Sequence, residues 1–205
     1  MTASSHDLFY QTALTAFSNL GSIQLNPPLS LPALLSLALA HNPSSSPPSP
    51  DVSTQSQTLT TKLLTHAAML SQYFSLSLSP PGVVTGIPLL LKSYTPPLGK
   101  LPAFLLRVAT EVDFKDEKKC FEGVSRELSA FYVPERLAPM REVDGEENEE
   151  SGEVGKRREE ISWLLEHVMF PAVRQRLVAT RELLEKGAVV EVANLRGLYR
   201  VFERC

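Results

Sequence analysis

Phe74-Ser-Leu-Ser-Leu-Ser79 alternates apolar and polar residues with a period of two, which predicts a half-buried strand. Pro81-Gly82 then turns the chain, and Val83-Val-Thr-Gly-Ile-Pro-Leu-Leu-Leu91 predicts the returning strand. Gly86 and Pro88 interrupt this second strand, which favours an edge position or a bulge. Because helical patterns surround the hairpin, the expected fold class is α/β (α+β).

Helical patterns before the hairpin predict Ser5–Leu20, Ser30–His41 and Thr58–Tyr73. Ser30 is a suitable N-cap for the second of these helices, which is apolar nearly all round and should be buried. A short strand is expected at Ser22–Leu25, and Pro27-Pro28 should end it.

After the hairpin, Pro102–Val112 is a continuous apolar run that suits either a buried strand or a buried helix, and we favour the strand. Asp113–Tyr132 predicts a helix capped by Asp113. Glu160–Val178 predicts the last long helix, with a kink at Pro171.

Two segments have the composition of disordered chain. Pro43–Gln57 is dominated by serine and proline, and Met140–Arg158 is acidic and polar. Near the C-terminus, Ala188–Ala193 predicts a strand, and Asn194 should cap a short helix that runs to about Phe202.

Charge and hydropathy exclude several classes of function. The net charge is −3, and seven of the 23 acidic residues lie between Glu142 and Glu153. The rest of the chain is only mildly basic, so DNA contact is expected to be weak or indirect. No apolar run approaches the ~18–20 residues that cross a bilayer, so no membrane partner is expected. Two cysteines make no disulfide framework, which suits a reducing compartment.

Common catalytic motifs are missing from the sequence: it has no GxxxxGK[ST], GxGxxG, HExxH or GxSxG. Glu166 and His167 are neighbours, which places them about 100° apart on a helix, a poor geometry for a shared metal. Cys205 ends the chain and carries both a thiolate and the α-carboxylate, so it can offer two ligands to a zinc-like ion. Alone it completes no site, so it is either an ordinary terminal thiol or part of a partner's site.

The segment Val190-Glu-Val-Ala-Asn-Leu-Arg-Gly-Leu-Tyr-Arg-Val-Phe-Glu-Arg-Cys205 closely resembles the C-terminus of the eukaryotic MutL homolog one family. These proteins are the MutL subunits of DNA mismatch repair that lack endonuclease activity. Further matches occur in the family's order: Leu8-Phe-Tyr-Gln11, Ala68-Met-Leu-Ser-Gln-Tyr-Phe-Ser-Leu76 with Gly86-Ile-Pro-Leu-Leu-Leu91, Ala109-Thr-Glu-Val-Asp-Phe114 with Glu117 and Cys120, and Leu164-Leu-Glu-His-Val-Met-Phe-Pro171, which looks like the fungal form.

The resemblance implies a two-lobed MutL C-terminal domain. Residues 1–25 plus 159–205 would form a discontinuous dimerisation lobe, and residues 26–140 an inserted external lobe with a disordered loop at 43–57. Residues 141–158 would be an acidic disordered linker. The family's ATPase domain and the strands that precede the first helix are absent, so a fragment is expected.

The resemblance also implies that the usual partner is an endonuclease-competent MutL homolog. The helix of that partner which carries its metal ligands corresponds here to Ser5-His-Asp-Leu-Phe-Tyr-Gln-Thr-Ala-Leu-Thr-Ala-Phe17, which contains no glutamate. The chain is therefore expected to be catalytically silent and to hold no cofactor of its own. Cys205 would reach zinc or manganese in the partner's site. The expected dimer interface consists of Phe9, Ala13, Phe17, Leu198, Tyr199, Phe202 and Arg204.

The family's external lobe docks short basic, aromatic peptides of other repair proteins, including the mismatch-repair exonuclease. Glu117, with Asp116 beside it, matches the acidic docking position, although a solvated helix start explains these acids equally well. The resemblance places the protein in the nucleus. Two alternatives stay open: an independent metal-dependent hydrolase built on Glu166, His167 and Cys205, and a generic homodimerisation domain.

Overall fold

The computed structural model describes residues 2–41, 52–135, 150–185 and 187. These residues combine helices with a three-stranded antiparallel sheet, which confirms the α+β class. The strand order is β1 (Gly21–Ser30), β3 (Val83–Leu89), β2 (Ser77–Ser79). Among the described helices, none has the length and apolar character needed to cross a bilayer.

The predicted hairpin is present as β2 and β3, but its first strand is shorter than expected, because Phe74 ends α4 and β2 begins at Ser77. β3 is the central strand and not an edge. The irregularity expected near Gly86 is present, because both pairings of β3 shift register between Val84 and Gly86. A side chain at Gly86 would place its Cβ 2.9 Å from Ser22 Oγ on β1. Glycine therefore allows β1 to approach this closely.

The first strand is longer than expected. Pro27-Pro28 does not end it, because β1 continues to Ser30 and pairs with β3 again at Leu29 and Ser30. The register shift between Gln24 and Leu29 accommodates the two prolines. β1 is an edge strand, where a missing backbone N–H leaves no ladder bond unmade.

The first two helices flank this strand. α1 spans Thr2–Thr15 and stops short of the expected Leu20, because Ser18 adopts a positive φ of 68° and its N–H donates to Tyr73 O. α2 spans Leu31–Ala40, and Ser30 caps it as predicted by accepting a hydrogen bond from Ala33 N.

One helix expected at Thr58–Tyr73 is two helices, α3 (Val52–Thr65) and α4 (Ala67–Phe74), which break at His66. α3 begins at Val52, so the disorder expected through Gln57 is wrong for its last six residues. The His66 ring stacks on Phe114, with ring centroids 4.2 Å apart. This contact holds the junction between α3 and α4 against the loop that precedes α6.

The strand expected at Pro102–Val112 is wrong: the segment forms α5 (Leu101–Glu111), preceded by a 3-10 turn, η1 (Leu98–Lys100). Pro102 lies in the first turn of α5, where its missing N–H has no intrahelical partner to lose. α5 is buried on most of its circumference, which explains the absence of a helical period in its sequence.

α6 spans Glu117–Tyr132, and its N-cap is Asp116 and not the expected Asp113. The Asp116 carboxylate accepts a hydrogen bond of 2.9 Å from Lys119 N. Asp113 instead accepts from Lys115 N in the preceding turn.

The predicted last long helix is α7 (Glu150–Leu164), a π-helical turn η2 (Leu165–Met169) and α8 (Phe170–Arg176), followed by α9 (Arg181–Glu185). The disorder expected through Arg158 is wrong from Glu150 onward. Pro171 cannot donate to the carbonyl four residues earlier, and the disturbance expected there takes the form of the π turn just before it.

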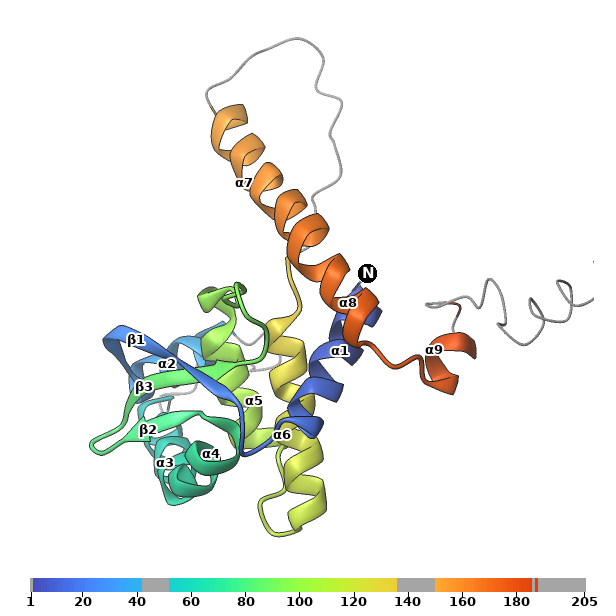
Figure 1. The fold of residues 1–205 in the computed structure, drawn as a ribbon. Helices are drawn as coiled ribbons and strands as arrows, with labels where there is room; N and C mark the ends of the chain where they lie inside the picture. Colours follow the sequence, from blue (N-terminus) through green and yellow to red (C-terminus); the bar gives the residue numbers. More distant parts are fainter. Residues whose placement is uncertain (1, 42–51, 136–149, 186, 188–205) are drawn as a thin grey trace, which may run out of the picture.

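The helices α5, α6, α1 and α8 pack in series, α2 and α3 lie against α5, and the sheet contacts α2 and α4 (Figure 1). α7 projects beyond the rest of the molecule. One apolar core runs from the sheet to Met169 and Ala172. α1 and α6 come from the two expected lobes and pack directly on each other. The division into lobes remains a prediction.

Candidate protein-docking surface

Two residues of the expected dimer interface are buried inside this chain. Phe9 is fully buried, stacks on Tyr94 at 5.8 Å and is tilted against Tyr132 at 5.4 Å. Ala13 is fully buried on the same helix. Their side chains cannot reach a partner, so this part of the expected interface is wrong. The apolar stripe of α1 faces the core of its own chain.

Phe17 lies just beyond α1 and remains partly exposed. Its ring contacts Tyr73 at 5.9 Å and Phe121 at 5.3 Å, and Tyr73 meets Phe121 edge-on. We call these three residues the aromatic patch. It joins the end of α1 to α4 and α6, so Phe17 belongs to this patch and not to the surface of α1.

The two acidic docking candidates differ in what they do. Asp116 caps α6 and has Lys119 Nζ 3.9 Å from its carboxylate. Glu117 is exposed and lies one turn before Phe121. Residues four apart share a helix face, so Glu117 lies beside the aromatic patch. In the part of the chain that the structure describes, Glu117 is the one of the two whose carboxylate is available to a ligand.

Large apolar side chains are exposed in the C-terminal segment and at Leu14 on α1. Trp163 is 59% exposed, Phe170 57% and Val178 69%; Leu184 and Leu14 are exposed as well. We call these five residues the C-terminal apolar surface. Of the eight large hydrophobic side chains exposed in the described ranges, these five and Phe17 lie in the segments expected to dimerise. Their exposure makes them candidates for an interaction site.

Gln11 connects α1 to this surface. Its Oε1 accepts a hydrogen bond of 2.9 Å from Val178 N, and its Nε2 donates one of 2.9 Å to Val178 O. A side-chain amide thus holds the backbone just after α8. The packing of α8 on α1 in Figure 1 brings the two residues together across 167 positions of sequence.

The geometry gives no support to a metal site at Glu166 and His167. The His167 ring stacks on Trp163 at 5.0 Å, and its Nδ1 lies 3.1 Å from Trp163 O. In the described ranges, no group of three or more His, Cys, Asp or Glu side chains converges as metal ligands do. His6 and Asp7 form only a pair, 3.7 Å apart.

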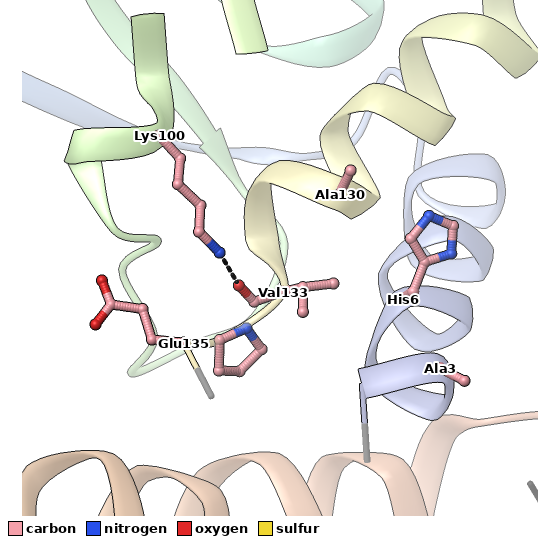
Figure 2. Close-up of a pocket in the computed structure, with 7 residues that line it drawn as sticks. Ala3, His6, Lys100, Ala130, Val133 and Glu135 are labelled. Atoms are coloured by element: carbon pink, nitrogen blue, oxygen red, sulfur yellow. Dashed lines mark hydrogen bonds between the residues drawn. The ribbon is translucent and has the colours of Figure 1, made fainter. Parts of the chain in front are cut away.

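A cavity of about 630 Å³ lies between the start of α1, η1 and the end of α6. Figure 2 shows Lys100 reaching across it to donate to Val133 O, a bond of 2.8 Å. The other polar groups at its wall are also paired, because His6 Nε2 meets Ser129 Oγ and Glu135 binds Arg157. A cavity whose polar groups already have partners offers little to a polar ligand.

The tail residues Leu198, Tyr199, Phe202, Arg204 and Cys205 lie outside the described residues. Trp163 and Phe170, by contrast, are surface residues that the sequence reasoning missed. Their signal was available, because both are large aromatics on the face of the last long helix opposite its inward apolar residues.

The family model for the DNA mismatch repair protein Mlh1 C-terminus matches residues 1–205. The chain is 37% identical over 214 residues to the DNA mismatch repair protein MLH1 of Saccharomyces cerevisiae, covering 98% of this chain and 26% of that protein. It is 32% identical over 208 residues to Dictyostelium discoideum DNA mismatch repair protein Mlh1, covering 97% and 23%. It is 31% identical over 202 residues to the putative MutL protein homolog 1 of Schizosaccharomyces pombe, covering 98% and 27%. The chain thus spans only about a quarter of the length of these relatives.

Proposed function

Because the chain belongs to the family of the C-terminus of the DNA mismatch repair protein Mlh1, we propose that it acts in mismatch repair by docking a second MutL homolog. The matching family model is that of the Mlh1 C-terminus, and the proposed role of this segment is one of assembly. The proposed partner is the endonuclease-bearing MutL homolog, and the proposed site of action is the nucleus. The exposure of five large apolar side chains in the segments expected to dimerise carries the proposal.

Burial of this surface would stabilise a heterodimer. Each large apolar side chain transferred from water to an interface contributes roughly 1.5–3 kcal/mol when fully buried. Exposed aromatic residues are also typical anchors of interfaces. Trp163 and Phe170 are therefore the residues expected to contribute most to binding.

A matched pair of double variants tests this proposal. Trp163→Ser/Phe170→Ser should abolish co-elution with the C-terminal domain of the endonuclease-bearing MutL homolog, measured by size exclusion with light scattering. Leu37→Ser/Leu98→Ser removes two exposed leucines outside the C-terminal apolar surface and should retain the complex. Equal affinities for the two double variants would overturn the proposal, as would a homodimer that ignores the partner.

Cys205 is proposed to complete the partner's metal site in trans. The thiolate of Cys205 would be a good ligand for zinc. Cys205→Ser should lower the zinc or manganese content of the purified complex while leaving dimerisation intact. Unchanged metal content in the variant complex would exclude this role.

Peptide recruitment is a second candidate function, favoured by the position of Glu117 beside the aromatic patch. A carboxylate next to partly exposed aromatic rings suits a basic, aromatic peptide. We propose that repair proteins such as the mismatch-repair exonuclease dock here. This site shares no residue with Trp163 and Phe170, so variants can separate the two functions.

A further inference from the structure

We propose that Gln11 is a positioning residue for the C-terminal apolar surface. The inference rests on the proposed function, because it concerns how the docking surface is held before a partner arrives. Its starting point is the pair of hydrogen bonds between the Gln11 amide and the backbone of Val178, both 2.9 Å long.

The N–H and the carbonyl of Val178 are available to Gln11 because α8 ends just before Val178. The last hydrogen bond of α8 runs from Leu177 N to Val173 O, and Leu177 then turns to an extended conformation with ψ 121°. Val178 N and O consequently have no helical partner. The carboxamide of Gln11 presents an acceptor and a donor side by side, which matches these two groups.

The contact also explains how an exposed residue is held. The Val178 side chain is 69% exposed, so burial does not anchor it. Leu177, beside it, is partly buried against the core, and the N–H of Leu183 lies 3.4 Å from Thr180 Oγ1 at the start of α9. The Gln11 amide adds the link that fixes the connecting backbone to α1.

The link holds the segment that carries Val178, and that leads into α9 with Leu184, against α1, where Leu14 lies one turn after Gln11. A surface that is ordered before binding loses less conformational entropy when the partner docks. Gln11 therefore acts on affinity through order in the free chain, and not through its own contact with a partner.

Gln11→Ala tests the inference by two readouts. Gln57→Ala on α3 is the control, because Gln57 is also a glutamine within a helix and is exposed. The first readout is amide hydrogen exchange of Val178 in the whole 205-residue chain. The second is affinity for the C-terminal domain of the endonuclease-bearing MutL homolog. Gln11→Ala should raise the exchange rate at Val178 about tenfold and weaken binding roughly fivefold to tenfold, as expected for losing two exposed hydrogen bonds.

Gln11→Glu sharpens the test, because it keeps the length of the side chain and the acceptor for Val178 N. It loses the donor and sets a carboxylate against Val178 O, so it should weaken binding at least as much as Gln11→Ala. Unchanged exchange at Val178 in Gln11→Ala would show that the two Gln11 hydrogen bonds do not hold the Val178 backbone. The proposed function would then still stand. Fast exchange with unchanged affinity would overturn the positioning role. A wild-type chain that binds no MutL partner while Val178 stays protected would overturn the proposed function, and the positioning role with it.

Discussion

The guanidinium of Arg107 on α5 grips the carboxylate of Glu127 on α6 with two contacts, Nε to Oε2 at 2.6 Å and Nη2 to Oε1 at 3.1 Å. The Glu127 side chain is only 6% exposed, whereas that of Arg107 is 56% exposed. The pair therefore neutralises a buried charge at the contact between two core helices. Loss of the pair should therefore lower the free energy of unfolding.

Arg107→Ala should lower the free energy of unfolding by about 2 kcal/mol, because it leaves the Glu127 carboxylate buried without its cation. Arg126→Ala removes an exposed arginine from α6 and serves as the control. Urea unfolding followed by circular dichroism measures both. A loss below about 0.5 kcal/mol for Arg107→Ala would show that the pair behaves as a surface ion pair.

Stability should fall at alkaline pH. Burial raises the pKa of Tyr94 and of Tyr132 well above the usual value, with Glu135 adding to the effect at Tyr94 and Tyr94 adding to it at Tyr132. The folded state thus holds these protons more tightly than the unfolded state. Their contribution is complete below about pH 10 and is lost as the pH rises above it.

Tyr94→Phe removes one of the two titrating groups, so its stability should decline less steeply above about pH 10. At neutral pH it should cost roughly 1 kcal/mol, because the 2.8 Å bond from Tyr94 Oη to Tyr132 O is lost. Thermal melts between neutral and alkaline pH provide the measurement. Parallel pH profiles for wild type and variant would contradict this account.

Cys120 should react slowly with thiol reagents. Burial raises the pKa of its thiol, and the negative charge of Asp113 raises it further. Only the thiolate attacks such reagents, and the side chain is also shielded. In a Cys205→Ser chain at pH 8, labelling of Cys120 should need denaturant to reach completion. Full labelling of the native chain within seconds would count against the buried environment.

Glu117→Lys should weaken binding of a basic, aromatic peptide from a repair exonuclease by tenfold or more, because the substitution replaces attraction by repulsion. Glu122→Lys on α6 is the matched control, since Glu122 is paired with Lys118 at 3.9 Å. Fluorescence anisotropy with a labelled peptide measures both. Equal affinities would assign Glu117 to a solvated helix start, and a parallel loss of dimerisation would mean that the variant had damaged the fold.

The extent to which the sequence predicted the fold depended on local signals. α6 and α2 were predicted because amphipathic spacing and a capping serine are encoded within a few residues. α5 was assigned to the wrong class because a segment buried on most sides has no hydrophobic period to read. β1 ran past Pro27 because its edge position, a property of the whole sheet, makes proline acceptable there.

The docking surface shows the same limit. The apolar stripe on α1 indicated that one face of the helix is buried. It did not indicate whether that face packs on α6 of the same chain or on a partner. The structure places Phe9 and Ala13 against their own core. The bond between Gln11 and Val178 was equally out of reach, because it joins residues 167 positions apart through backbone atoms that every residue shares.

Trp163 allows the most direct test of the docking surface, because it is the sole tryptophan of the chain and is 59% exposed. The chain would be labelled with 5-fluorotryptophan, and its fluorine resonance recorded while the unlabelled C-terminal domain of the endonuclease-bearing MutL homolog is added. We predict a new resonance for the complex that no longer responds to solvent exchange between H2O and D2O. A complex that forms by light scattering while the resonance and its solvent response stay unchanged would contradict the claim that this surface docks the partner.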